Sequence, residues 1–333
     1  MRLRRIVTLA CLLLLFPASA VRGWSEAGHK IIASIAFRQL SPAQQSKLAA
    51  LLKQHPRYAE DFAPHMPPEV GKGAAEIQGE WLLQQAAIWP DMARGLPDDL
   101  KQKYNHPTWH YIDLPTFLSD ADRTAIEKSL SLNQSLDPPN SPQSDMNAVQ
   151  TIRLARKTLA ARPASEAEAA VWLCWLLHDV GDLHQPLHST AMFSTNLFPE
   201  GDKGGNSVPT QQGFNLHALW DEFLGDWTTF AAARRRAGEL SADVRLAQLG
   251  RTAAAQLDEK QWLTESRQLV DSVVYTPEVL GYLRVQPART DGRPPLPLRV
   301  SEEYLTTGVR IATDRVVQAG FRLGAVLKPL AGE

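Results

Sequence analysis

Residues 165–188 read SEAEAAVWLCWLLHDVGDLHQPLH, an almost unbroken apolar run that ends in a cluster of three histidines and two aspartates. Ser165 followed three residues later by Glu168 is the pattern of a capping box, which begins a helix. The apolar residues occupy nearly every face of that helix, so we expect it to be central and buried. Pro186 disfavours a helical residue before it, so the helix should end there and His188 should return from the following turn.

Two histidine–aspartate pairs have the spacing of a metal site on a helix. His178 and Asp182 are four residues apart, so their side chains project from one face, and Gly181 between them permits a close approach. The segment NLHALWD repeats this spacing with His217 and Asp221. One such pair is more often a surface hydrogen bond, but charged groups are rarely buried unless they are paired or bind a metal. Two pairs on apolar helices therefore favour zinc, which accepts imidazole nitrogen and carboxylate oxygen.

The rest of the chain also has helical periodicity. Apolar residues at three-to-four spacing predict further helices over residues 42–53, 74–89, 145–161, 214–225, 241–256, 258–274 and 301–325. No alternating strand pattern of useful length and no internal repeat is present. We therefore expect an all-α protein with a single compact multi-helix domain over residues 24–333. Residues 189–213, with Gly201, Gly204 and Gly205, form a predicted long loop, and loops of this length are usually functional or disordered.

Residues 1–23 have the layout of a secretory signal peptide, with arginines, then an apolar run, then small residues. The small-x-small rule permits cleavage after Ala20 or after Gly23. We expect export to the periplasm or out of the cell. No other segment is apolar enough to span a membrane, so no stable membrane association is expected.

The charge balance excludes binding through a broad basic surface. Residues 1–23 contain four arginines and no acidic residue, so residues 24–333 carry 31 basic and 36 acidic side chains, a net charge of −5. A protein that binds nucleic acid by a basic track has the opposite sign. Cys174 is the one cysteine after the signal segment, so we expect no internal disulfide and a buried thiol.

Five motifs occur in one order: WSEAGH at 24–29, WPDMAR at 89–94, WHYIDLP at 109–115, HDVGDLHQPLH at 178–188, and GDKGGN with NLHALWD at 201–221. Together they resemble the zinc-dependent single-strand-specific nucleases, the type I nuclease/3′-nucleotidase family that includes mung bean nuclease. The resemblance runs from residue 24 to about 225 and continues more weakly to the last helix. It implies an all-α fold around a buried trinuclear zinc site, related to zinc-dependent phospholipase C.

The resemblance also implies which residues bind the three zinc ions. The first ion would be held by Asp91, His110, His178 and Asp182, the second by His188, His217 and Asp221, and the third by the amino group and carbonyl of Trp24, by His29 and by Asp182 as a bridge. A primary amine binds zinc, whereas an amide nitrogen inside the chain does not. This ligand set therefore favours cleavage after Gly23.

The implied activity is hydrolysis of single-stranded RNA and DNA, and of 3′-nucleotides, to 5′-phosphorylated products by a hydroxide that bridges two zinc ions. Arg94 would face the scissile phosphate as a catalytic residue. Tyr111 would stack on a nucleobase, and Asp113 would hydrogen-bond to that base and share in catalysis. A duplex hides the base faces that stacking requires, which gives a physical reason for single-strand preference. We expect a monomer.

Two other functions fit the same residues. The first is a zinc-dependent phospholipase C, and the second is an exported zinc-binding protein without catalysis. An enzyme of either kind and a non-catalytic protein differ in the metal site. An enzyme needs an open coordination position in a cleft, whereas all positions of a structural site are filled by protein ligands.

The predicted ligands include five of the nine histidines. His55 and His65 lie in proline-bearing loops, so we expect them to be exposed to solvent. His106 has no partner at metal spacing. His184 lies on a different face of the helix from His178, so we expect a structural role for it.

Overall fold

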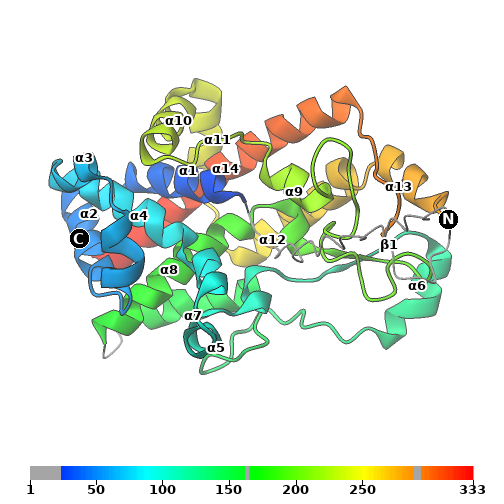
Figure 1. Cartoon of the computed structure of the whole chain (residues 1–333), viewed down its shortest axis with the longest axis horizontal. Helices are drawn as coiled ribbons and strands as arrows, with labels where there is room; N and C mark the ends of the chain where they lie inside the picture. The colour runs from blue at the N-terminus through cyan, green and yellow to red at the C-terminus, as the bar shows by residue number, and fades with distance from the viewer. Residues whose placement is uncertain (1–23, 162–164, 288–293, 333) are drawn as a thin grey trace, which may run out of the picture.

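The computed structural model describes residues 24–161, 165–287 and 294–332, and the predicted signal peptide, residues 1–23, lies outside these ranges. The structure is mostly helical, as expected (Figure 1). The α-helices are α1 (Glu26–Phe37), α2 (Pro42–Leu52), α3 (Pro68–Gly71), α4 (Ala75–Met92), α5 (Asp98–Tyr104), α6 (Asp120–Ile126), α7 (Ala148–Ala160), α8 (Glu166–Asp182), α9 (Leu216–Asp221), α10 (Phe230–Ala242), α11 (Val244–Ala254), α12 (Glu259–Leu269), α13 (Pro277–Arg284) and α14 (Glu302–Ala331).

Helix α8 is the centre of the fold, as the opening segment predicts. The Ser165 hydroxyl accepts the backbone N–H of Glu168 and caps the helix. Nearly every residue from Ala169 to Asp182 is buried, and the helix packs against α4 and α7. A short 3-10 helix, Pro186–Ser189, follows and carries His188, so the chain does turn back at the proline.

The expected set lacks α1 and α10, and also the shorter helices α3, α5, α6 and α13. The sequence of α1, EAGHKIIASIAF, is apolar on most faces, and ten of its twelve residues are buried. Helix α8 is similarly enclosed, but Ser165 and Glu168 mark its start, whereas Ser25 before α1 is followed three residues later by Gly28 and makes no side-chain capping hydrogen bond. Helix α1 packs against α4, α10 and α14, with α14 crossing the molecule behind it (Figure 1).

Several boundaries differ from the expectation. Helix α4 continues through Pro90 to Met92, although the predicted helix ended at Trp89. The last helix extends to Ala331 rather than to residue 325. Two three-residue strands, β1 (Pro115–Phe117) and β2 (Ala191–Phe193), pair in parallel and join the segment after His110 to the segment after His188. These strands are too short to be recognised by alternation.

A buried charged cluster lies beneath the C-terminal end of α8. The Nη1 of Arg322 is 2.9 Å from Nε2 of His184, and Arg315 donates to the His184 carbonyl oxygen. Both arginines also bind the carboxylate of Glu265. Burial raises the pKa of Glu265, but the two guanidinium groups outweigh burial and lower it to about 2. The cluster therefore fixes the turn that follows Asp182, and the expected structural role of His184 agrees with this position.

Among the described residues, no helix combines the length and apolarity of a membrane span. Cys174 is fully buried in α8 and is not bonded to another cysteine, as expected. Burial raises the pKa of its thiol well above the usual range.

We predict that Gly320→Ala lowers the free energy of unfolding by about 1–3 kcal/mol, the usual effect of overpacking a filled core. A Cβ at Gly320 would lie 2.6 Å from the Cβ of Ile35, where α14 crosses α1. Gly281→Ala is the matched control, because no atom lies within 4 Å of the corresponding Cβ in α13. It should stabilise by about 0.4–1 kcal/mol. Urea unfolding of both variants measures the difference, and equal effects would contradict it.

Candidate metal centre

The centre is built on the carboxylate of Asp182. Its Oδ2 lies 3.1 Å from His178 Nε2 on the same helix and 3.2 Å from His110 Nδ1. Its Oδ1 lies 3.2 Å from His29 Nε2 of α1. His188 Nδ1 is 3.7 Å from Oδ2. Four histidines from four separate segments therefore converge on one buried carboxylate.

Asp91 closes the first group of ligands. Its Oδ1 lies 3.8 Å from His178 Nε2 and 3.9 Å from His110 Nδ1, and those two ring nitrogens are 2.8 Å apart. Two ligands of one tetrahedral zinc ion stand roughly 3.3–3.6 Å apart, and the observed separations fall on both sides of this range. Pro90 removes a backbone N–H from the end of α4, and nearby the Ala87 carbonyl accepts the Nδ1–H of His178 at 2.7 Å. That bond leaves Nε2 of His178 as the ligand nitrogen.

A second group forms where α9 meets the 3-10 helix Pro186–Ser189. Nε2 of His188 and Nε2 of His217 are 3.1 Å apart, and Asp221 Oδ2 is 3.5 Å from the latter. The outer nitrogens are held by backbone, since His188 Nδ1 is 2.6 Å from the His110 carbonyl oxygen. The other Asp221 oxygen accepts from the Gln185 side chain at 2.8 Å.

His29 approaches Asp182 from the opposite side, over Gly181. A Cβ at Gly181 would lie 2.9 Å from His29 Nδ1, so α1 and α8 can meet there only at a glycine. Trp24 is buried at the start of α1, and the next residue, Ser25, donates its backbone N–H to the Asp221 carbonyl oxygen at 3.4 Å. Residue 24 therefore lies beside both groups of ligands. All the predicted ligand side chains gather at one centre.

The donor set fits divalent metal ions. Three sets of side chains place one nitrogen or oxygen each within 4.8 Å of one another: His110 with His178, Asp179 and Asp182; His29 with Asp91 and His178; and His188 with His217 and Asp221. Burial, assisted by the Arg94 guanidinium, lowers the pKa of His110 to about 3, so this ring is neutral and a nitrogen lone pair is available. The buried carboxylates outnumber the nearby arginines, and bound cations would offset their charge.

Asp179 is a member of the first set that the sequence analysis missed. It follows His178 directly, is fully buried, and neither carboxylate oxygen has a hydrogen-bond partner among the described residues. Burial, with the charges of Asp182 and Asp91, raises its pKa well above the usual range. The sequence did contain a signal for Asp179, because an aspartate inside an apolar helix next to a predicted ligand is unusual. It was not recognised, because no histidine lies four residues before or after it.

Arg94 lies against the ligand Asp91. Its Nη2 is 2.7 Å from Asp91 Oδ1, while its Nη1 is buried and has no acceptor among the described residues. The guanidinium therefore has one N–H group beside the centre that a further anion could use.

Tyr111 and Asp113 line a cavity of about 260 Å³ next to the second group of ligands, and His217 forms part of its wall. Burial and the charge of Asp202 raise the pKa of Asp113 to about 6. The predicted loop after residue 189 closes the cavity. There, Gly204 has a φ of 60° and its carbonyl oxygen accepts from His217 Nδ1 at 2.7 Å. A Cβ at Gly204 would meet the Leu187 carbonyl oxygen at 2.4 Å, so this turn requires glycine.

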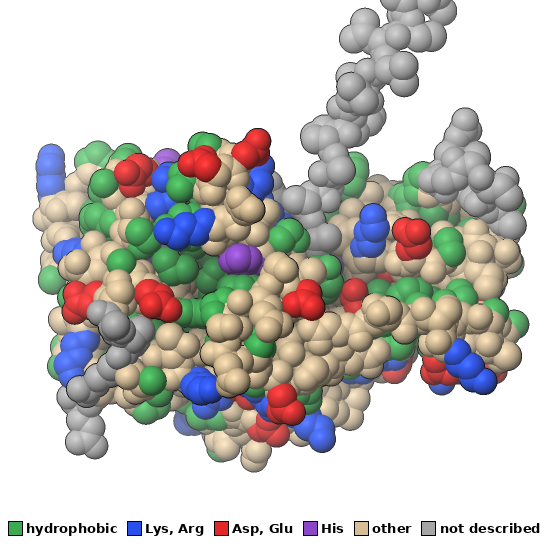
Figure 2. All heavy atoms as spheres, turned by 90° about the horizontal axis from the view of Figure 1, so that it is seen from below, with side chains coloured by type: hydrophobic (Ala, Val, Ile, Leu, Met, Phe, Trp, Pro, Cys, Tyr) green, Lys and Arg blue, Asp and Glu red, His purple; other side chains and the backbone are tan. Residues whose placement is uncertain are grey.

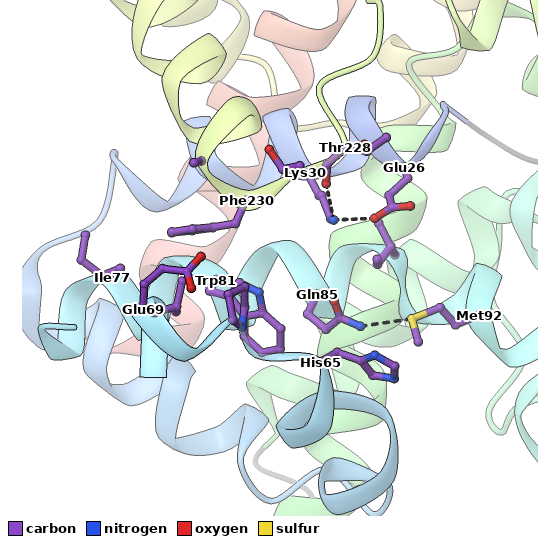
Figure 3. A pocket seen from close by; sticks show the side chains of 15 residues that line it. Glu26, Lys30, His65, Glu69, Ile77, Trp81, Gln85, Met92, Thr228 and Phe230 are labelled. Carbon is purple, nitrogen blue, oxygen red and sulfur yellow. Dashed lines mark hydrogen bonds and ion pairs between the residues drawn. The ribbon is translucent and has the colours of Figure 1, made fainter. Parts of the chain in front are cut away.

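A larger hollow of about 700 Å³ lies between α1, α4 and the segment before α10 (Figure 3). Its lysine, Lys30, is engaged by the Glu26 carboxylate and by the Thr228 carbonyl oxygen, as Figure 3 shows. Glu69 adds a further negative charge to the wall. These charges do not suit phosphate, so the smaller cavity beside His217 is the better candidate for substrate.

The remaining histidines lie apart from the ligand sets. The expectation that His55 is exposed is wrong: it is 3% exposed and packs against Phe62 and Trp89, because the loop folds under α4. Burial lowers its pKa to about 3. His65 is exposed, as expected, and His106 stacks on Trp109 with ring centroids 3.8 Å apart.

Comparison with known proteins gives a consistent result. The family model described as S1/P1 Nuclease matches residues 24–332. Endonuclease 2 of Arabidopsis thaliana is 24% identical over 328 residues, which cover 96% of this chain and 94% of that protein. Endonuclease 1 of the same plant is 25% identical over 337 residues, which cover 97% of this chain and 92% of that protein.

We predict that Gly181→Ala weakens metal binding by roughly tenfold or more, since changes in the residues that support a ligand typically cost 10- to 100-fold. The added methyl group would displace the His29 ring from Asp182. Gly79→Ala in α4 is the control, because its Cβ would make ordinary contacts of 3.4 Å with Phe37. Competition with a chelator measures the affinity of the two purified variants. Equal affinities would contradict the proposed approach of His29.

Proposed function

Because the chain belongs to the S1/P1 nuclease family, we propose that it is an exported zinc enzyme that hydrolyses single-stranded RNA and DNA, and 3′-nucleotides, to 5′-phosphorylated products. The family is one of metal-dependent nucleases, so nucleic acid is the substrate class. The observation that carries the proposal is the meeting of His29, His110 and His178 at Asp182, next to a cavity walled by His217. Imidazole and carboxylate donors of this kind suit zinc.

We assign three zinc ions to the described side chains. The ligand sets are Asp91, His110, His178 and Asp182; His188, His217 and Asp221; and Trp24, His29 and Asp182. The third set needs the free amine of Trp24, and this requires removal of residues 1–23 after Gly23. Support comes from the contact between Ser25 and Asp221, which places residue 24 beside the other ligands. Removal of a signal peptide implies a periplasmic or secreted enzyme.

Zinc at this centre would supply hydroxide at neutral pH and offset the charge of a phosphate. The protein's own groups bind and orient the substrate. The unpartnered Nη1 of Arg94 can donate to a phosphate oxygen, while its Nη2 stays on Asp91. The cavity lined by Tyr111 and Asp113 lies beside His217. A nucleobase bound in this cavity would therefore place the phosphate of its nucleotide next to the proposed zinc ligands. Asp113 would accept an N–H from that base.

The shape of the cavity supports single-strand preference. A base must leave its stack to contact Tyr111, and an unpaired strand allows this at low cost. A ligand in the cavity wall also supports an enzyme over a closed structural zinc site.

The charge of the protein supports a short substrate footprint. Residues 24–333 have a net charge of −5, and the face in Figure 2 intersperses acidic and basic side chains without a continuous basic track. Affinity would then come from the metal centre and one stacked base. A monomer suffices for this, since the described residues of one chain contribute every ligand side chain.

The decisive experiment compares substrates with zinc-loaded, signal-free protein. We expect release of 5′-phosphorylated products from single-stranded RNA and DNA, and phosphate release from 3′-nucleotides, with a shallow dependence on salt because few phosphates are contacted. His178→Ala should lose nearly all turnover together with metal. Cleavage of phosphatidylcholine with both nucleic acids left intact would favour a phospholipase C instead. Zinc binding without any hydrolysis would favour a non-catalytic protein.

The base cavity yields a second prediction. Tyr111→Ala should raise KM by roughly 5- to 150-fold, because stacking contributes about 1–3 kcal/mol per base. Asp113 has a pKa of about 6, so the acceptor form is gained as pH rises from 5 to 7 and KM should fall over this range. Asp113→Asn should remove that part of the pH profile. Steady-state kinetics on a 3′-nucleotide measures both effects, and an unchanged profile in the asparagine variant would exclude the contact.

A further inference from the structure

Asp179 and His110 are each left with an unmet hydrogen-bonding group at the metal centre. Both side chains are fully buried. The two carboxylate oxygens of Asp179 have no hydrogen-bond partner among the described residues. The same is true of Nε2 of His110. Buried polar groups are nearly always hydrogen-bonded, so these atoms require an explanation, as do the ring nitrogens of His29, which also lack a hydrogen-bond partner among the described residues.

The two residues lie on the same side of α8. Trp175, His178, Asp179 and Asp182 follow the spacing that places side chains on one helix face. The His110 ring packs edge-on against that face, with centroids 5.2 Å from Trp175 and 4.8 Å from His178. One oxygen of Asp179 lies within 4.8 Å of a ring nitrogen of His110. The two side chains are therefore neighbours.

The other nitrogen of His110 is already accounted for. Nδ1 faces His178 Nε2 at 2.8 Å and Asp182 Oδ2 at 3.2 Å, so it is the ligand nitrogen. A neutral imidazole that binds metal through Nδ1 carries its proton on Nε2, and this N–H needs an acceptor. The ligand histidines His178 and His217 have carbonyl oxygens in this role, from Ala87 and Gly204. His110 has none.

We propose that Asp179 is a positioning residue of the metal centre, whose carboxylate accepts the Nε2–H of His110 and thereby fixes the ligand nitrogen of that ring. The inference rests on the proposed zinc centre. It adds a carboxylate that none of the ligand sets above contains. Ligand histidines commonly donate their outer N–H to a carboxylate, which orients the ring and raises its basicity as a ligand.

The test is a pair of substitutions with zinc affinity as the readout. Asp179→Leu removes the acceptor, so zinc affinity should fall roughly 10- to 100-fold. Asp179→Asn keeps an amide oxygen that can accept the same N–H, so its loss should be several-fold smaller. Chelator competition on the apo-protein measures both. Circular dichroism shows whether each variant is folded, and Glu80→Gln is the control because it alters another buried carboxylate, paired with Arg234, outside the ligand sets.

A second readout needs no leucine variant. The imidazole N–H protons of the zinc-loaded protein, observed by NMR, should include a slowly exchanging Nε2–H from His110 whose resonance shifts in Asp179→Asn and not in Glu80→Gln. Equal losses of affinity in the leucine and asparagine variants would indicate that Asp179 binds metal directly, and unchanged affinity in both would make it a bystander; each overturns the proposal. Absence of zinc binding by the unaltered protein would overturn the zinc centre as well.

Discussion

The structure depends on one buried carboxylate, Asp182, which faces imidazoles from α1, from α8 and from the 3-10 helices Pro107–His110 and Pro186–Ser189. A carboxylate in a dry interior is costly unless cations or hydrogen-bond donors surround it. The helix that bears it is buried along most of its length, and the segments that supply the histidines pack around its C-terminal end. The packing of the core and the pairing of Asp182 with these histidines require the same arrangement of segments.

Backbone groups, more than side chains, set the direction of the ligand rings. His178 donates to the Ala87 carbonyl oxygen in α4, and His217 donates to Gly204 in a left-handed turn. A carbonyl oxygen has two lone pairs, so each of these acceptors can bind a side-chain N–H in addition to any backbone bond. On the far side, Arg315 and Arg322 hold the turn that contains His184, which precedes the ligand His188. Backbone carbonyl oxygens and the two buried arginines thus orient the histidines of the proposed metal centre and the turn that leads to it.

An acidic protein can still act on a polyanion if its positive charge is concentrated in bound metal. The buried carboxylates attract the cations, and the cations in turn attract phosphate. Arg94 contributes the nearby guanidinium, and its partner Asp91 keeps it in place. The large hollow is lined by Lys30, which already binds Glu26 and Thr228, and by negatively charged groups, so we expect substrate to bind at the proposed metal centre and not in the larger cavity.

The sequence by itself determined the features that depend on residues a few positions apart in the chain. The capping residue Ser165, the buried helix behind it and the pairs His178–Asp182 and His217–Asp221 all follow from helix geometry, and the ordered motifs predicted the family before the fold was described. Sequence patterns missed α1, because no capping pair marks its start as Ser165 and Glu168 mark the start of α8.

Only the tertiary structure decided which distant groups meet. It placed His29 over Gly181, buried His55 beneath α4, and left Asp179 beside His110 without a partner. None of these contacts lies within one helical turn, and each depends on how segments separated by many residues pack. The physical reason is that spacing along a helix fixes directions within a few residues, whereas burial and partnership are set by the whole core.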